Sequence, residues 1–281
     1  MQVLLAKSAG FCLGVRRAVD KALSVAAESG APVFTDGPLI HNSAMLAELE
    51  RHGIRIADDP AAVPSGAALV VRAHGIPPER RKALLAATPR LVDATCPEVA
   101  RIQGTIRSRV ASGRSVVILG DAGHAEVVGL LGHAEGRGHV VASAADVEAL
   151  PADLAPVTLV AQSTQDEETF AAVAEAVRSR FPGAEILDTI CAATRSRQGE
   201  LRKLAARADM LVVVGSPTSA NTRRLAAIGA RLRPTILVRG ADDIRPAEFA
   251  AARVVGLTAG ASTPDDAIQA VRARLESLPT P

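Results

Sequence analysis

Short apolar runs alternate with helical stripes along the chain, and one order of elements returns three times. A buried strand is followed by a cysteine and then by a helical pattern, with the strands at residues 3–6, 91–93 and 186–187. In the first of these helices, over residues 14–28, apolar side chains recur every three to four residues, as on the buried face of an amphipathic helix. This strand–helix alternation predicts an α/β protein with parallel sheets.

Capping and turn residues mark the expected ends of the helices. Pro97 suits a first helical turn, with Thr95 or Cys96 as the cap. Thr164 and Glu167 fit a capping box ahead of another apolar stripe. Other helices are expected over 43–52, from 78 onward, from 192 to about 208 and from about 265 onward, and further strands over 31–35, 68–72, 115–119, 157–161, 211–214 and 254–257.

The three cysteines of the chain divide it into near-thirds. Cys12, Cys96 and Cys191 are separated by 84 and 95 residues. Each lies between a strand and a helix, so each unit of the repeat offers one thiol at a corresponding place. Where thiols stay reduced, an odd number of widely spaced cysteines favours metal binding or catalysis over a disulfide framework.

Polar side chains follow the strands at matching distances from these cysteines. A first side chain comes 28 to 30 residues after the cysteine of its unit: His41, His124 and Asn221. A second comes 62 to 71 residues after it: His74, Ser163 and Ser262. Ligands bind at the carboxyl ends of parallel strands. Three units facing one another would therefore gather these side chains, the thiols and Glu126 in one cavity.

The length of the chain bears on its domain organisation. A chain of 281 residues exceeds the size at which a single hydrophobic core usually keeps growing. We therefore expect three similar small α/β lobes, over residues 13–95, 96–190 and 191–281, arranged with pseudo-threefold symmetry around a central cavity. Hydrophobic residues make up 48% of the chain, which is sufficient for well-filled cores.

Charge and composition exclude several classes of function. A net charge of +2 and an aromatic content of 2% argue against a general nucleic-acid surface. No apolar run approaches the roughly 20 residues that span a bilayer, and the N-terminus lacks the features of a secretory signal. We expect a cytoplasmic protein that binds neither membranes nor nucleic acids and that holds anions only at a local site.

The grouped residues suggest a particular chemistry. Three thiolates suit a soft metal or an iron–sulfur cluster. A cubane cluster usually takes four cysteines, so three would leave one iron open to substrate. Histidines, hydroxyls and helix N-termini suit a phosphate or diphosphate, and Glu126 is a candidate proton donor. Together these features suggest the reduction of a small phosphorylated molecule.

Other interpretations of the same residues stay open. The cysteines and histidines could form a zinc site of a non-catalytic α/β protein, although the close pairs typical of zinc sites are missing. The cysteines could also be packing residues of a phosphate-binding protein without a cluster. Basic runs on the helices are expected to be solvated faces, one of which could meet an acidic electron carrier: Arg16-Arg17, Arg80-Arg81-Lys82 and Arg223-Arg224.

Ordered motifs around the cysteines resemble those of the 4-hydroxy-3-methylbut-2-enyl diphosphate reductase family, which catalyses the last step of the methylerythritol phosphate route to isoprenoids. The resemblance covers the whole chain. Its motifs are Gly-Phe-Cys-Leu-Gly-Val-Arg-Arg-Ala from Gly10, Gly-Pro-Leu-Ile-His-Asn from Gly37, Ala-His-Gly from Ala73, Asp-Ala-Thr-Cys-Pro from Asp93, Gly-His-Ala-Glu-Val from Gly123, Ile-Cys-Ala-Ala-Thr from Ile190 and Thr-Ala-Gly-Ala-Ser from Thr258.

The resemblance implies an oxygen-sensitive [4Fe-4S] cluster on Cys12, Cys96 and Cys191, with Glu126 as the catalytic proton donor. It implies two-electron reductive removal of the substrate hydroxyl, giving isopentenyl and dimethylallyl diphosphate, with ferredoxin or flavodoxin as electron donor. The N-terminal strand 1–12 would join the third lobe, and a monomer is expected. The implied substrate contacts are His41, His74, His124, Ser163, Ser219, Asn221 and Ser262.

Three positions depart from the usual pattern of that family. Ser163 stands where threonine is common, and it keeps the hydroxyl while losing a methyl group. Ala220 stands where a second serine often follows Ser219, so one hydroxyl contact to the diphosphate would be lost. Ala192 stands where tyrosine often follows the third cysteine. These changes leave open a paralogue that acts on a related allylic diphosphate.

Overall fold

The computed structural model describes residues 1–59, 61, 63–88, 90–154 and 156–279, and it divides into two compact units. We call the first the terminal unit: Met1–Val15, His41–Met45 and Ala192–Pro281. We call the second the central unit: Arg16–Ile40 and Leu46–Cys191.

The central unit contains two parallel sheets, of which the first has the strand order β3-β2-β4-β5. Its core includes Leu69 and Val71 of β4, which point to the same face and pack with Leu84 of α3. Gly53 has φ +78 and lies just after the end of α2. The elements are α1 (Leu13–Ser29), β2 (Val33–Asp36), α2 (Ser43–Arg51), β3 (Ile54–Ala57), β4 (Ala68–Val71), α3 (Pro78–Ala87) and β5 (Leu91–Asp93).

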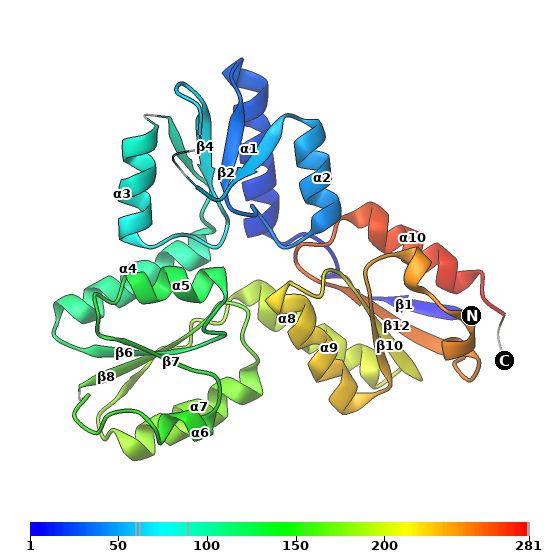
Figure 1. Ribbon diagram of the computed structural model, residues 1–281. Coiled ribbons are helices and arrows are strands. Elements are labelled where there is room, and N and C mark those ends of the chain that lie inside the picture. The colour runs from blue at the N-terminus through cyan, green and yellow to red at the C-terminus, as the bar shows by residue number, and fades with distance from the viewer. Residues whose placement is uncertain (60, 62, 89, 155, 280–281) are drawn as a thin grey trace. The chain divides into compact units, whose positions relative to one another are not determined.

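The second sheet of the central unit has the order β7-β6-β8-β9 and is covered on both faces (Figure 1). Alternate side chains of β6 point to opposite faces of the sheet. Val116 and Ile118 pack with α4 and α5, while Val117 and Leu119 pack with α6 and α7. The elements are α4 (Pro97–Ala111), β6 (Ser115–Leu119), α5 (Ala125–Gly132), β7 (Gly138–Val141), α6 (Ala144–Val147), β8 (Val157–Ala161), α7 (Glu167–Arg180) and β9 (Glu185–Ile186).

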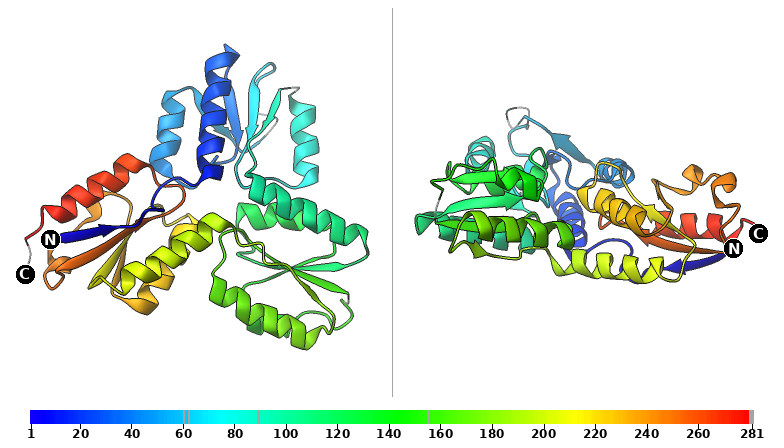
Figure 2. Two further views of the ribbon diagram at one scale, coloured as in Figure 1. Left: turned by 180° about the vertical axis from the view of Figure 1, so that it is seen from behind. Right: turned by 90° about the horizontal axis from the view of Figure 1, so that it is seen from below.

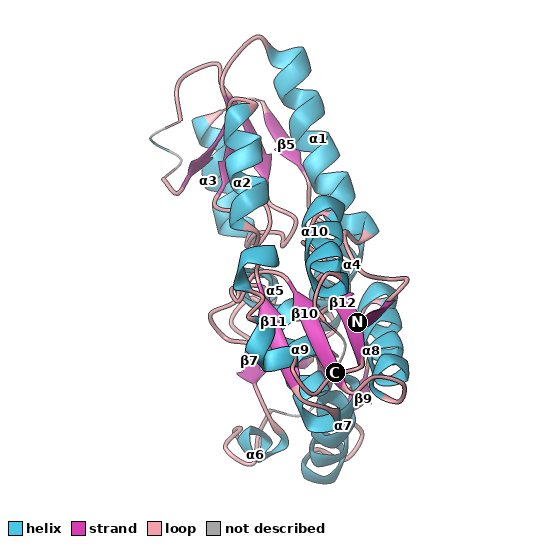
Figure 3. Cartoon of the chain, turned by 90° about the vertical axis from the view of Figure 1, so that its right-hand side faces the viewer, coloured by secondary structure: helices cyan, strands magenta, loops and turns pink. Residues whose placement is uncertain are grey.

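The sheet of the terminal unit has the order β1-β12-β10-β11, so the N-terminal strand lies beside β12 (Figure 2). Figure 3 shows β10, β11 and β12 side by side. Val212 and Val214 of β10 pack on the side of α10, and Leu211 and Val213 pack on the side of α8 and α9. The elements are β1 (Gln2–Leu5), α8 (Ala192–Ala205), β10 (Met210–Val214), α9 (Ala220–Leu232), β11 (Thr235–Val238), the short 3₁₀ helices Ala241–Asp243 and Pro246–Phe249, β12 (Val254–Ala259) and α10 (Asp265–Glu276).

The predicted α/β class is confirmed, with three sheets of four strands each in the described residues and parallel pairing between the neighbouring strands. The sequence pattern does not predict β3, β7 and β11, each of which is one of the two edge strands of its sheet. In β3 the two central side chains are exposed, and in β7 and β11 only the last residue is buried. Because these edge strands are partly solvated, they lack the buried apolar run that marks a central strand.

Two predicted helix boundaries are wrong. The expected capping box of Thr164 and Glu167 does not start α7, because Asp166 is the N-cap and accepts a hydrogen bond from the Glu168 N–H at 3.2 Å. The helix after Cys191 ends at Ala205 rather than near 208. The cap at Cys96 and the first-turn position of Pro97 are as predicted.

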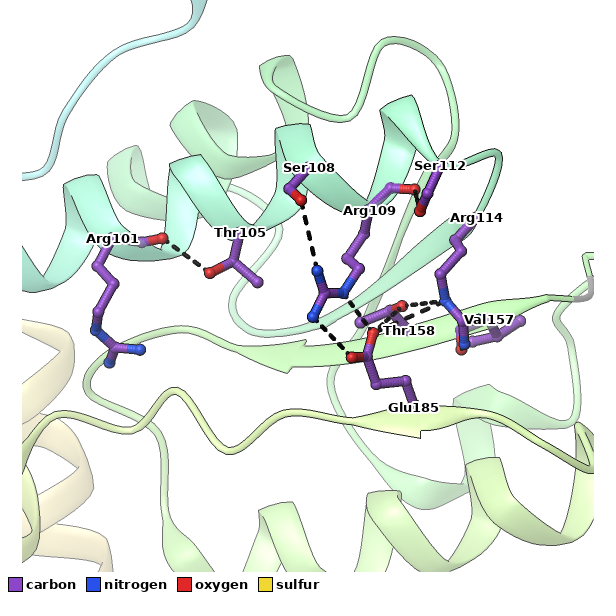
Figure 4. A network of polar contacts seen from close by, with 9 residues as sticks. All are labelled: Arg101, Thr105, Ser108, Arg109, Ser112, Arg114, Val157, Thr158 and Glu185. Carbon is purple, nitrogen blue, oxygen red and sulfur yellow. Dashed lines mark hydrogen bonds and ion pairs between the residues drawn. The ribbon is translucent and has the colours of Figure 1, made fainter.

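A polar network joins α4 to the second sheet of the central unit (Figure 4). Arg109 donates to both carboxylate oxygens of Glu185, at 2.6 and 2.8 Å. Thr158 donates its hydroxyl hydrogen to Glu185 at 2.9 Å and accepts from Arg114 at 2.7 Å. The Arg109 hydrogen bonds hold the pKa of Glu185 below its ordinary value of 4.5.

Replacing Glu185 by glutamine is expected to lower the free energy of unfolding at neutral pH by about 1 kcal/mol, because a bidentate charge-assisted pair is lost. The pKa of Glu185 is lower in the folded protein, so its stabilisation is complete above pH 4.5 and disappears as the pH falls through the folded value. Urea denaturation at decreasing pH should therefore show wild type and variant converging. Glu175→Gln is the control, because its 3.5 Å pair with Arg178 is exposed. An equal effect of both changes contradicts this account.

Among the described residues, no helix combines the length and the apolar character needed to cross a membrane.

Candidate active site

A buried carboxyl group lies at the candidate site of the central unit. Glu126, in the first turn of α5, is 2% exposed. Ser163 donates to both of its oxygens: the backbone N–H to Oε1 at 2.6 Å and the hydroxyl to Oε2 at 2.8 Å. Because Ser163 follows β8, these bonds join the start of α5 to the carboxyl end of that strand. The carboxyl group is thus held in one orientation.

Two predicted histidines lie next to one another in the central unit. His124 is the N-cap of α5, and its Nδ1 accepts the Glu126 N–H at 3.1 Å. A neutral His124 ring therefore carries its proton on Nε2, where it can donate to a ligand. The His74 ring meets the His124 ring edge-on, with centroids 5.4 Å apart and planes at 81°.

Glycines in α5 allow this helix to pack closely against the segment that follows His74. A Cβ at Gly132 would lie 2.5 Å from the Cβ of Pro77, and a Cβ at Gly129 would lie 3.5 Å from the carbonyl carbon of Gly75. Larger side chains at Gly132 would push α5 away from the segment that follows His74. The distance between the loops of His74 and His124 therefore depends on these small residues.

The backbone around each cysteine makes the same contact in all three repeats. The backbone N–H groups of Cys12, Cys96 and Cys191 donate to the carbonyls of Ala261, Ala73 and Ser163, at 3.2, 2.9 and 3.0 Å. Each carbonyl belongs to the second residue after a strand: β12, β4 or β8. The repeat predicted from the sequence is therefore a repeat of local structure. In the central unit it connects Cys191 directly to the serine that holds Glu126.

An aspartate shapes the chain before two of the cysteines. Asp93 Oδ1 accepts the Thr95 N–H at 2.9 Å, and Asp188 Oδ1 accepts the Ile190 N–H at 3.1 Å. Such side-chain turns fix the approach of the chain to the helix that follows. Each aspartate lies three residues before its cysteine, Cys96 or Cys191, and this equal spacing is visible in the sequence.

None of the three described cysteines forms a disulfide, and each is half-buried and lies at the start of a helix. Cys96 is the N-cap of α4, and Cys191 directly precedes α8. Cys12 precedes α1, and its Sγ accepts the Val15 N–H at 3.4 Å. Helix N-termini stabilise negative charge, so each place suits a thiolate ligand. The three positions thus fit the donor set of a soft metal centre.

A residue that the sequence analysis missed lies beside Ser163. His74 and Ser262 are each the third residue after the end of a strand, β4 or β12. The third residue after β8 is Thr164, not Ser163. The Thr164 hydroxyl oxygen is buried and has no hydrogen-bond partner among the described residues. Counting from the strand ends instead of from the cysteines would have identified Thr164 as a candidate contact.

The terminal unit brings together another group of predicted residues. Ser262 donates its hydroxyl hydrogen to the carbonyl of His41 at 3.1 Å, and its own carbonyl accepts from the Asn42 side chain at 2.8 Å. Ser262 directly follows Ala261, whose carbonyl accepts a hydrogen bond from the Cys12 N–H at 3.2 Å. Hydrogen bonds made by Ser262 and by the preceding residue Ala261 therefore connect the loop of Ser262 to His41 and to Cys12.

The start of α9 in the terminal unit has the character of an anion site. Ser219 is the N-cap, and its hydroxyl oxygen accepts the Thr222 N–H at 3.4 Å. Asn221 is 5% exposed, and its side-chain Nδ2 has no hydrogen-bond partner among the described residues. A buried amide donor at a helix N-terminus lacks only an acceptor, such as a phosphate oxygen.

Comparison with known proteins decides the family. The family model of the LytB protein matches residues 3–276, which is nearly the whole chain. The chain belongs to the LytB protein family. A relative from Opitutus terrae is 45% identical over 291 residues, covering 99% of this chain and all of its own length. One from Solidesulfovibrio magneticus is 41% identical over 285 residues with the same coverage. Both relatives are described as 4-hydroxy-3-methylbut-2-enyl diphosphate reductase.

Solved structures agree with the LytB assignment. A structure of E-1-hydroxy-2-methyl-but-2-enyl-4-diphosphate reductase from Plasmodium falciparum aligns with a TM-score of 0.93 at 28% identity, covering 99% of this chain and 89% of its own. A structure of (E)-4-hydroxy-3-methyl-but-2-enyl diphosphate reductase, described as the terminal enzyme of the non-mevalonate pathway, aligns with a TM-score of 0.72 at 35% identity. This alignment covers 99% of the present chain and 100% of the chain in that solved structure.

The candidate residues of this LytB chain fall into two groups. The central unit holds Cys96, Cys191, His74, His124, Glu126 and Ser163, and the terminal unit holds Cys12, His41, Ser219, Asn221 and Ser262. Within each unit, hydrogen bonds or ring contacts connect several of these residues, as described above. That both groups form one cavity stays a prediction.

Proposed function

We propose that this chain reduces (E)-4-hydroxy-3-methylbut-2-enyl diphosphate to isopentenyl diphosphate and dimethylallyl diphosphate, the last step of the methylerythritol phosphate pathway. The relatives named above support this reaction. In the reaction the carbon–oxygen bond of the substrate hydroxyl breaks and a carbon–hydrogen bond forms. Two electrons and two protons enter, and one water leaves. The observation that carries the proposal is the buried Glu126, fixed by Ser163, whose carbonyl accepts the Cys191 N–H.

The three half-buried thiols fit an iron–sulfur cluster, because each lies at a helix start that favours a negative ligand. We propose that Cys12, Cys96 and Cys191 hold one [4Fe-4S] cluster per chain. When bound, the cluster would supply the electrons and one iron without a protein ligand, which acts as a Lewis acid toward the substrate hydroxyl. The remaining steps depend on the side chains of the chain.

Glu126 is the proposed proton donor. Ser163 donates to both oxygens of the carboxylate, so the side chain is already oriented before the substrate binds. When Glu126 is protonated, the Ser163 hydroxyl can rotate and accept its hydrogen, because a hydroxyl is both donor and acceptor. Ser163 thus supports either protonation state. The missing methyl group relative to threonine does not change these two hydrogen bonds.

The diphosphate would be held by neutral donors and helix N-termini. His124 would donate from Nε2, because its Nδ1 already accepts the Glu126 N–H. Asn221 would donate from the buried Nδ2 that lacks a partner in the described residues. The remaining proposed contacts are His41, His74, Ser219 and Ser262, with Thr164 as an added candidate. Ala220 supplies no hydroxyl, which costs about 0.5–1.5 kcal/mol of substrate binding if no other donor replaces it.

The electrons would come from a small carrier protein, ferredoxin or flavodoxin, which meets the chain in the cytoplasm. We propose that the chain acts as a monomer. The absence of a hydroxyl at Ala220 supports one alternative: a paralogue of the same reaction type whose preferred substrate is a related allylic diphosphate.

Anaerobic turnover with a chemical reductant tests the proposal. The purified chain should convert the hydroxylated C5 diphosphate to both products, followed by chromatography. Conversion of a related allylic alcohol diphosphate, with the C5 compound left unchanged, would establish the paralogue instead. Absence of any reduction by protein that carries its cluster would contradict the proposed reaction.

A further inference from the structure

The central unit has a hollow of about 510 Å³ that includes none of the proposed site residues. It lies between α3, which contributes Arg81, Lys82 and Leu85, and α4, which contributes Gln103 and Arg107. The sequence predicts a solvated face for the basic run Arg80-Arg81-Lys82. Two of its residues, Arg81 and Lys82, line this concave surface.

Positive charge predominates in this hollow. Arg81 is paired with Asp93 at 2.6 Å. Lys82 and Arg107 have no carboxylate partner in the part of the chain that the structure describes. Arg107 lies 3.4 Å from His133 Nδ1. Burial, and then the nearby Arg107 cation, lower the pKa of His133, so this ring does not add charge at neutral pH.

Two further cations lie at the edge of the hollow on α1. Arg17 donates to the carbonyl of Thr95 at 3.0 Å, and Lys21 donates to the carbonyl of Asp93 at 2.8 Å. Thr95 and Asp93 are lining residues. Both acceptors are backbone carbonyls, and neither cation has a carboxylate partner among the described residues. Asp93 lines the hollow, and Glu79 of α3 lies within electrostatic range of the lining residue His133, so cations outnumber carboxylates here.

The hollow leads directly to a proposed cluster ligand. Thr95 lines it, and Cys96 is the next residue. Cys96 caps α4, and the helix residues Ala100, Gln103 and Arg107 repeat from it every three to four positions, so they continue one face of α4 from Cys96. A partner docked on this face would lie beside Thr95. The Thr95–Cys96 peptide bond connects that residue to the proposed cluster ligand.

The chemistry of the surface favours one class of partner. Leu85, 54% exposed, places an apolar side chain among the cations, as is common where proteins dock. With aromatics at only 2% of the chain, a nucleic-acid surface with stacking residues is not supported. The proposed reaction consumes two electrons from outside the chain, and a carrier must bring them near a cluster ligand.

We propose that this hollow and its cationic edge dock the electron donor, a small acidic redox protein whose carboxylates face Lys82, Arg107 and Arg17. The inference rests on the proposed function. Each docked carrier gives up one electron and leaves oxidised, so two encounters reduce one substrate. Docking itself makes or breaks no bond. Complementary charge would act mainly on the rate of encounter.

Charge reversal tests the docking surface in the cluster-loaded enzyme. Lys82→Glu with Arg107→Glu should lower kcat/KM for reduced flavodoxin by about ten- to a hundredfold at low ionic strength. Turnover with dithionite-reduced viologen should stay unchanged. The control is Arg207→Glu with Arg274→Glu, two exposed cations of the terminal unit that produce the same change in net charge. The neutral pair Lys82→Gln with Arg107→Gln should show a smaller loss.

The outcomes separate this inference from the proposed function. Flavodoxin-driven turnover of wild type should fall with salt, and that of the reversed pair should depend on salt much less. Equal losses in the reversed pair and the control, or no loss in either, would overturn the docking site. Loss of viologen-driven turnover in the reversed pair alone would also overturn it, because these residues would then affect the reaction itself. Wild type that is inactive with viologen would instead contradict the proposed function.

Discussion

Replacing Cys96 by serine is expected to abolish the brown colour and the turnover of the anaerobically purified enzyme. A serine hydroxyl is not deprotonated at neutral pH and is a poor ligand for the iron of a cluster, so only two of three thiolates would remain. The fold should persist, because Cys96 is the N-cap of α4 and serine is a favourable N-cap residue. The hydrogen bond from the backbone N–H of residue 96 to the Ala73 carbonyl does not involve the side chain and should also remain.

Visible absorbance, turnover and thermal unfolding measure this effect. Ala100→Ser is the matched control, because it introduces the same hydroxyl one turn further along α4 at an exposed position. The control should keep its colour and its turnover with a chemical reductant, and both variants should keep a folded far-ultraviolet spectrum. A Cys96 variant with full colour and activity would exclude this residue as a ligand.

Glu126→Gln is expected to keep substrate binding and to lose about a hundred- to ten-thousandfold in turnover, because the donor of the reaction proton is removed. Glutamine can keep both contacts with Ser163: its oxygen accepts the backbone N–H, and its amide donates to the hydroxyl oxygen. The geometry of the site should therefore change little. The loss should appear in single-turnover experiments with bound substrate.

Glu185→Gln serves as the matched control for Glu126→Gln. Glu185 also accepts a hydroxyl hydrogen in the central unit, from Thr158 at 2.9 Å, but it belongs to the network between α4 and the sheet. Its replacement should lower stability and leave turnover per folded molecule unchanged. If Glu126→Gln instead weakens substrate binding and bound substrate still reacts at the normal rate, Glu126 is not the proton donor.

Much of the fold follows from periodicity, whereas the edge strands β3, β7 and β11 do not. The stripe of α1 and the cap at Cys96 are local signals, and the structure confirms both. The strands β3, β7 and β11 each pair with the strand that precedes them in the chain, β2, β6 or β10, and this pairing leaves no periodic signal in their own residues. The start of α7 at Asp166 depends on the path of the chain after β8, which a capping motif alone does not specify.

The site was predictable to the extent that it repeats. The shared contact of the three cysteine N–H groups explains why matched distances from the cysteines lead to equivalent loop positions, among them the candidates His74 and Ser262. Counting from the cysteines is uncertain by a few residues because the loops differ in length, and Thr164 was therefore missed. The residue types made Glu126 a candidate proton donor and the histidines candidate diphosphate contacts. The residue-by-residue roles were implied by family resemblance, since spacing does not distinguish a proton donor from a helix cap.

The iron and sulfide content of anaerobically purified wild type tests the central claim most directly. If Cys12, Cys96 and Cys191 hold one cubane cluster, the brown protein should contain about four irons and four inorganic sulfides per chain. Colourless protein that cannot be reconstituted, or protein with one zinc and no sulfide, would contradict the account.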